Sequence, residues 1–192
     1  MGFVLHRAVI LHAPIGGGKT TTVEAVSEGA KSDGLKVMGI LSKRVFEGGE
    51  KPSYEILELD TGERMSLVKL ASMEPGEGWE SYGNPYYVFS KKGFCSANLA
   101  LKRAAEELKD GVVVFVDKYG RLESQHKGIH LGAVMVANAL RHSGVVVYLC
   151  RDDKVDERAR IDLVKGRTAR FFNLDDGQVD EILRIMRDCS KL

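Results

Sequence analysis

The sequence lacks a long hydrophobic run, is poor in cysteine and has no excess of either charge, and each shortage excludes a class of protein. The most apolar run, Val112 to Val116, stops at Asp117 and is far too short to cross a bilayer. The three cysteines are far apart and odd in number, which suits neither a disulfide framework nor a CxxC metal site and indicates a reducing cytoplasm. The 28 basic and 27 acidic residues leave a net charge of +1, which gives no reason to expect nucleic acid or a membrane as a partner.

The segment Met1 to Leu11 has no feature of a targeting signal. His6 and Arg7 interrupt its apolar residues, and it contains no small-residue cleavage site. His6 also stands where an N-myristoylation signal beginning at Gly2 would have Ser or Thr. We therefore expect a cytoplasmic protein without a leader or a lipid anchor.

The composition and the alternation of patterns predict one α/β domain spanning residues 1–192. Hydrophobic residues make up 44% of the 192 residues, as is usual for a globular chain with its own core. Apolar runs predict strands at 7–12, 36–41, 112–116, 145–150 and 169–174, and helical spacing predicts helices at 20–31, 94–109, 131–141, 156–165 and 178–189. Such alternation implies right-handed crossovers and a mostly parallel sheet covered by helices, a three-layer arrangement.

Residues 43–90 break this alternation and are predicted to form a strand-rich insertion within the single domain. Two short strands, 54–59 and 64–70, flank Asp60-Thr61-Gly62-Glu63, which is typical of a β-hairpin. Residues 74–85 are rich in Gly and Pro and are predicted to form a loop.

The segment 13–20 fits the relaxed Walker A pattern of P-loop proteins, with Ala in place of the first Gly. Its glycines let backbone N–H groups converge on phosphate oxygens, and the following helix directs its positive N-terminus at the same anion. Lys19 is expected to reach the β and γ phosphates, and the Thr20 hydroxyl to bind magnesium. The predicted nucleotide-binding residues are Ala13, Pro14, Ile15, Gly16, Gly17, Gly18, Lys19, Thr20 and Thr21.

Asp117 follows the strand predicted at 112–116 and is the candidate Walker B acid. The carboxyl ends of parallel strands are where ligands bind in open α/β sheets, and a carboxylate there can hold magnesium through water or through Thr20. Thr20 and Asp117 are thus the predicted magnesium-binding residues. Lys118 comes next, and Glu123 is the nearest acid downstream.

Three segments together resemble the THEP-type nucleoside triphosphatases, also called cancer-related nucleoside triphosphatases. They are the P-loop 13–20, the segment Glu47-Gly48-Gly49 followed by YEILELDTGE at 54–63, and DKYGRLE at 117–123, while Val146 to Arg151 is similar to a family strand that ends in Arg. The LDTGE hairpin is the most distinctive of these, because P-loop proteins in general do not contain it. The resemblance runs through most of the chain and implies a RecA-like fold, Mg²⁺ as cofactor and hydrolysis of nucleoside triphosphates such as ATP or GTP.

The chain departs from the family at the residue after Asp117. The family usually reads DEIGPME where this chain reads DKYGRLE, so Lys118 replaces the acid that polarises the attacking water. A protonated ammonium has no lone pair and cannot accept the proton. Glu123 is therefore the candidate substitute, with a salt bridge in an exposed loop as the alternative. Arg151 could stabilise charge on the transferring phosphoryl group or form a salt bridge at a helix start. Lys19, Glu123 and Arg151 make up the predicted catalytic set. We expect slow hydrolysis to diphosphate and phosphate.

Other functions remain open at this stage. Asp117 to Gly120 also fits the DxxG element of GTPases, and Asp153 to Asp156 is similar to their base-reading NKxD, with Asp153 in place of Asn. A P-loop domain without its water-polarising acid could instead be a nucleotide-binding switch or regulatory protein. Nucleotide-kinase chemistry would need an acceptor pocket, for which Trp79, Tyr82, Tyr86 and Tyr87 could supply stacking surface. The sequence does not identify a protein partner.

Overall fold

The computed structural model describes residues 7–12, 19–46, 52–73, 76–140, 143–150, 163–164, 169–173 and 178–190, with the backbone alone at positions 19, 20, 173 and 190. The strands are β1 (Ala8–His12), β2 (Lys36–Val45), β3 (Ser53–Glu58), β4 (Arg64–Leu70), β5 (Trp79–Glu80), β6 (Tyr87–Ser90), β7 (Val112–Tyr119), β8 (Val145–Cys150) and β9 (Ala169–Asn173). The helices are α1 (Lys19–Ser32), α2 (Lys91–Glu107), α3 (His130–Ala139) and α5 (Val179–Ser190), with short 3-10 turns at Ala71–Met73 and Glu123–Gln125.

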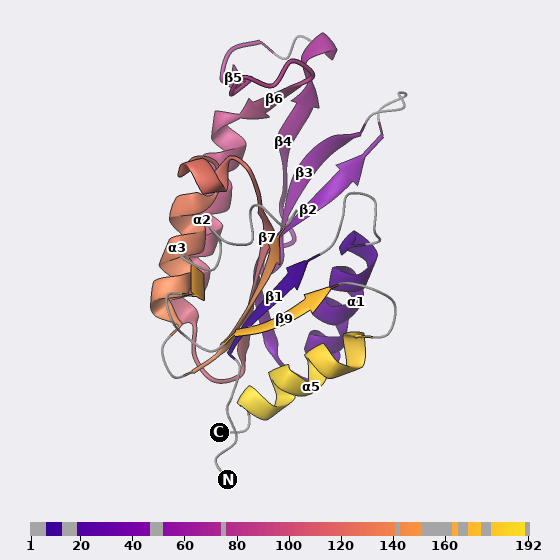
Figure 1. Ribbon diagram of the computed structural model, residues 1–192, viewed down its shortest axis with the longest axis vertical. Coiled ribbons are helices and arrows are strands. Elements are labelled where there is room, and N and C mark those ends of the chain that lie inside the picture. Colours follow the sequence, from indigo (N-terminus) through magenta and orange to yellow (C-terminus); the bar gives the residue numbers. More distant parts are fainter. Residues whose placement is uncertain are drawn as a thin grey trace.

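The strands of the described residues form one sheet in the order β5-β6-β4-β3-β2-β7-β8-β1-β9. The part β2-β7-β8-β1-β9 is parallel, as predicted. The strands β3, β4, β6 and β5 continue it antiparallel from the edge of β2, and they form the narrow upper part of the molecule in Figure 1. The sheet is therefore parallel in its core and antiparallel in the insertion.

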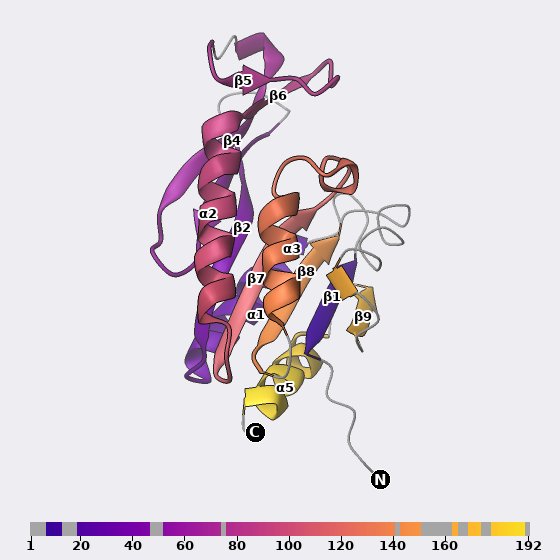
Figure 2. The same cartoon turned by 90° about the vertical axis from the view of Figure 1, so that its left-hand side faces the viewer.

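Helices cover both faces of the parallel part. Figures 1 and 2 show α2 and α3 side by side on one face, and α1 with α5 on the other. Strand β7 contributes to both interfaces, since Val114 and Val116 pack on the α2/α3 side while Val113 and Phe115 pack on the α1/α5 side. This burial on both faces explains its unbroken apolar run and confirms the predicted three layers.

Close strand packing requires glycine at position 39 of β2. Gly39 has φ +95°, and a Cβ placed there would lie 2.1 Å from the carbonyl oxygen of Phe115 on β7. No other residue avoids both the positive φ and the overlap. Gly39 thus lets β2 pair closely with the strand that carries Asp117.

The structure corrects several predicted boundaries. β7 continues to Tyr119, so the prediction that this strand ends at Val116 was wrong; Tyr119 is fully buried and continues the core. β2 extends to Val45 because its second half pairs with β3. The predicted loop 74–85 contains β5, whereas the helix predicted at 156–165 lies outside the described residues except for 163–164. Among the helices described, none has the length and apolarity needed to cross a membrane.

Candidate nucleotide-binding site

The predicted phosphate loop connects a buried strand to a helix. β1 ends at His12 and α1 begins at Lys19, which is the strand and helix setting that a Walker A loop requires. Residues 13–18, the side chains of Lys19 and Thr20, and Arg151 lie outside what the structure describes, while Thr21 is exposed in the first turn of α1. The fold therefore confirms the context of the motif, and the roles of its residues stay predictions.

The sheet register relates Asp117 to the end of β1. Asp117 pairs with Leu149 on β8, and Leu149 pairs with Leu11, the residue before His12. Asp117 and Leu11 therefore lie in the same row of the sheet, two strands apart, and β1 ends one residue further on at His12. At about 4.8 Å per strand this separation is about 10 Å, a span suited to a hydrated metal ion and phosphates next to Asp117.

The carboxyl group of Asp117 is buried and held by β2. It is 6% exposed, and one of its oxygens, Oδ2, accepts a hydrogen bond of 2.8 Å from the backbone N–H of Ser42. Magnesium prefers oxygen ligands and usually takes one or two carboxylates together with phosphates of the substrate. No group of three His, Cys, Asp or Glu residues that could hold a metal occurs among the described residues, which do not include the side chain of Thr20.

Lys118 directly follows Asp117 near the end of β7. Its Nζ lies 4.6 Å from the centre of the Tyr54 ring on β3, in a cation–π contact. The pairing of β7 with β8 shifts register between Asp117 and Tyr119, which places Lys118 at an irregularity of the strand. Such irregularities re-aim side chains next to active sites. The ammonium thus lies toward the insertion rather than over β8.

Glu123 is buried and organises the loop after β7. It is 6% exposed, its Oε2 accepts from the N–H of Gly120 at 2.9 Å, and its Oε1 accepts from the N–H of Ile129 at 3.1 Å. Burial raises the pKa of the Glu123 carboxyl, although these two N–H groups and the charge of Lys118 act in the opposite direction. A raised pKa suits a proton acceptor near neutrality, yet both oxygens also close the turn 120–129.

A cavity of about 580 Å³ opens beside Asp117 and Glu123. Its lining combines residues of the parallel sheet, the insertion, the first turn of α2 and the loop after β7. The polar and charged lining residues are Ser42, Arg44, Asn84, Asp117, Lys118, Arg121 and Glu123, and the aromatic ones are Tyr54, Tyr87, Phe89 and Phe94. The structure therefore brings the Walker B region into contact with an aromatic-walled hollow.

Of the aromatic residues that line the cavity, only Tyr87 was predicted from the sequence. Of the four aromatic residues proposed for stacking, Tyr87 lines the cavity, whereas Tyr82 packs against Phe89 and Phe94 and Tyr86 is exposed. Trp79 lies under the ammonium of Lys69 instead. Ser42, Tyr54, Phe89 and Phe94 were missed, because they come together only through the pairing of β2, β3, β4 and β6 and the packing of α2, which follows β6.

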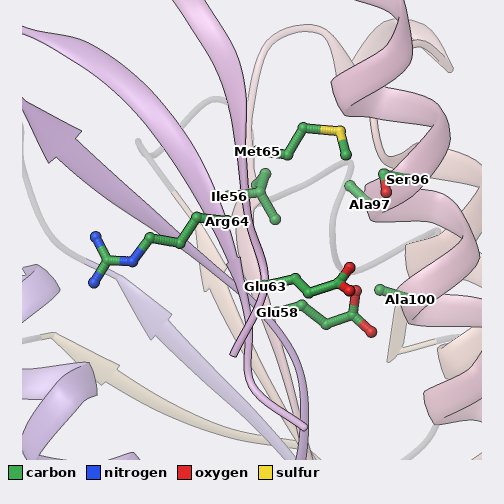
Figure 3. A pocket seen from close by; sticks show the side chains of 8 residues that line it. All are labelled: Ile56, Glu58, Glu63, Arg64, Met65, Ser96, Ala97 and Ala100. Atoms are coloured by element: carbon green, nitrogen blue, oxygen red, sulfur yellow. The ribbon is translucent and has the colours of Figure 1, made fainter. Parts of the chain in front are cut away.

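The distinctive LDTGE hairpin lies away from this edge. Leu59 bonds the carbonyl of Gly39, which is paired with Phe115, so the turn lies behind Asp117 along the strands. Glu58 is buried and binds Arg103 of α2, and Figure 3 shows the carboxylates of Glu58 and Glu63 together facing α2 while the Arg64 side chain points away. The hollow there is about 10 Å³, room for at most one water molecule. The hairpin thus contacts α2 through the ion pair of Glu58 and Arg103.

The strand order, the helix layers and the setting of the two motifs define a P-loop NTPase fold of the RecA-like type. The family model described as NTPase matches residues 8–186, and the chain belongs to this family. It is 29% identical over 108 residues to the nucleoside-triphosphatase THEP1 of Pyrococcus abyssi, covering 56% of this chain and 55% of that protein. It is 33% identical over 108 residues to the nucleoside-triphosphatase THEP1 of Methanocaldococcus jannaschii, covering 56% and 58%.

The matched segment thus spans little more than half the length of these two relatives. The crystal structure of THEP1 from the hyperthermophile Aquifex aeolicus superimposes with a TM-score of 0.67 at 19% identity, covering 96% of this chain and 99% of that one. At that identity the likeness shows the fold alone. It confirms the predicted RecA-like architecture.

Proposed function

We propose that this protein binds a magnesium nucleoside triphosphate and hydrolyses it slowly to the diphosphate and phosphate. The observation that carries the proposal is the shared row of the sheet, which aligns Asp117 with the end of β1 across β8. The names of the relatives, which are nucleoside-triphosphatases, support the same reaction.

In this proposal the loop 13–18 and Thr21 bind the phosphates, and Lys19 neutralises the β and γ phosphates. Thr20 and Asp117 hold Mg²⁺, which supplies charge neutralisation at the phosphoryl group. The N–H of Ser42 orients the Asp117 carboxylate toward that task. Arg151, which follows β8 in the sequence, would stabilise charge on the transferring group.

Slow turnover follows from the residues that could polarise water. Lys118 has no lone pair when protonated, and its ammonium faces Tyr54. Glu123 lines the cavity beside Asp117, and its raised pKa favours proton acceptance, which makes it the candidate base. Its two backbone hydrogen bonds limit how far it can turn toward a water. Positioning and electrostatics then supply most of the rate.

The GTPase alternative is less well supported by the same loop. That interpretation assigns the N–H of Gly120 to the γ phosphate, but this group donates to Glu123 instead. The second element of that alternative, 153–156, lies outside the described residues. We therefore propose hydrolysis without a fixed preference for guanine.

The experiment is a panel of ATP, GTP, CTP and UTP, with binding measured by calorimetry and phosphate release measured separately at saturation, each with and without magnesium. Asp117→Asn should remove most of the gain in affinity that magnesium gives, and lower phosphate release at least ten-fold, because the metal loses a charged ligand. The matched control is Asp60→Asn in the exposed hairpin turn. Equal magnesium dependence in wild type and Asp117→Asn would refute the assignment.

A further inference from the structure

We propose that the cavity beside Asp117 is a binding site for a second ligand, a small aromatic phosphate ester such as a nucleoside monophosphate. The described residues that line it belong neither to β1 nor to α1, and it shares Asp117 and Glu123 with the proposed hydrolytic site. Binding of this second ligand does not require that the triphosphate be hydrolysed.

The size and walls of the cavity fit an aromatic ring. Its volume of about 580 Å³ lies within the range of pockets that enclose drug-sized ligands. Tyr54 and Tyr87 meet edge to face with ring centres 6.5 Å apart, while Phe89 and Phe94 stack with centres 6.1 Å apart. Tyr82 packs behind the phenylalanines and fixes their orientation. Fixed aromatic faces of this kind bind a planar ring by stacking.

The charged lining favours an anion on that ligand. Arg44, Lys118 and Arg121 supply three cations, and Arg44 and Arg121 are exposed and able to reach a ligand at the mouth. These three cations stand against two acids, Asp117 and Glu123, which accept hydrogen bonds from the backbone N–H groups of Ser42, Gly120 and Ile129. Guanidinium groups match phosphate oxygens in geometry as well as charge. A ligand that joins an aromatic ring to a phosphate could stack its ring on the aromatic side chains and place its phosphate beside the arginines at the opening of the cavity.

Ser42 gives independent support for a ligand. Its side chain is 5% exposed and lines the cavity, and its Oγ has no hydrogen-bond partner within the described residues. A buried hydroxyl without a partner costs free energy, so such groups in native proteins call for an explanation. A polar atom of a bound ligand would supply the missing partner, deep in the cavity and next to Asp117.

The test measures binding of AMP and GMP by calorimetry while a non-hydrolysable triphosphate analogue with magnesium saturates the P-loop. The matched probes are adenosine, which lacks the phosphate, and ribose 5-phosphate, which lacks the aromatic ring. We expect a monophosphate to bind at one site per chain, and both truncated probes to bind at least ten-fold more weakly. Phenyl phosphate separates a general aromatic phosphate site from one that also reads a nucleoside.

Two variants locate the site. Ser42→Ala should weaken monophosphate binding about five-fold, because one hydrogen bond is lost. It should not lower the melting temperature, because the hydroxyl has no partner among the described residues. Arg44→Gln should weaken it about ten-fold. The controls are Ser27→Ala, a buried serine of α1, and Arg64→Gln, whose side chain points away from α2.

Failure of this proposal can be told apart from failure of the proposed hydrolysis. Lys19→Ala should lose triphosphate binding and keep monophosphate binding. The proposal is overturned if monophosphates bind only when the P-loop is empty, if Ser42→Ala and Arg44→Gln bind them as wild type does, or if Ser42→Ala changes only the magnesium dependence of triphosphate binding.

Discussion

Replacing Glu123 by Ala should destabilise the protein substantially, because two buried N–H groups would lose their acceptor. Those of Gly120 and Ile129 donate to its two oxygens at 2.9 and 3.1 Å. A buried donor left without a partner costs about 1–3 kcal/mol, so Glu123→Ala should lower the free energy of unfolding by about 2–5 kcal/mol. Glu123→Gln keeps one acceptor and turns an NH₂ toward the other N–H, so it should cost about half as much.

The pH dependence of this loss gives a second check. Burial raises the pKa of Glu123 in the folded state, so the folded state favours the neutral carboxyl. Its contribution to stability is therefore complete below the ordinary pKa of a glutamate and declines as pH rises through the raised value. The advantage of wild type over Glu123→Gln should shrink over that interval.

The assay is urea unfolding monitored by circular dichroism at several pH values. The matched control is Glu106→Ala, an exposed glutamate of α2 whose replacement should change stability by no more than about 0.5 kcal/mol. If Glu123→Ala is no more destabilising than this control, the carboxylate does not hold the loop. Activities of Glu123 variants should then be compared only at pH values where each variant is folded.

Two further predictions concern this loop and the end of the strand before it. Gly128→Ala should destabilise the protein by about 2 kcal/mol or more, because Gly128 has φ +61° and a Cβ would lie 2.2 Å from Oε1 of Glu123. In the same unfolding assay Gly76→Ala, with a similar φ and open space, should show only the backbone cost of about 1–2 kcal/mol, and equal losses would contradict the packing argument. Lys118→Glu should raise phosphate release at saturating magnesium triphosphate about ten-fold or more, because a water-polarising acid returns. A folded Lys118→Glu protein that is no faster than wild type would refute the role given to this position.

The parallel part of the fold could be predicted from the sequence because its strands are buried on both faces. The run 112–116 is apolar throughout because helices cover both of its faces. The change from continuous apolar runs to apolar residues at helical spacing marks where each crossover helix begins. The end of β7 was harder to predict. Asp117 interrupts the apolar run, yet the strand continues to Tyr119. Its main-chain pairing with β8 does not depend on the polarity of one side chain.

The candidate site could be predicted only where its residues are contiguous in sequence. The motif 13–20 and Asp117 carry their chemistry in local pattern and spacing. Ser42, Tyr54 and Phe89 do not, because they meet Asp117 only through the pairing of β2, β3, β4 and β6. From the sequence, Glu123 was expected to be either a base or part of an exposed salt bridge. The second expectation was wrong, because Glu123 is buried and accepts from two backbone N–H groups, which have no sequence signal.

The central claim is that the segment after β1 binds a magnesium triphosphate, and calorimetric titration of Lys19→Ala tests it most directly. Wild type should bind the triphosphate in a magnesium-dependent way, and Lys19→Ala should bind it at least ten-fold more weakly, because the ammonium that neutralises the β and γ phosphates is gone. Lys31→Ala, on an exposed position of the same helix, is the matched control and should bind as wild type does. Equal affinity in wild type and Lys19→Ala would contradict the account.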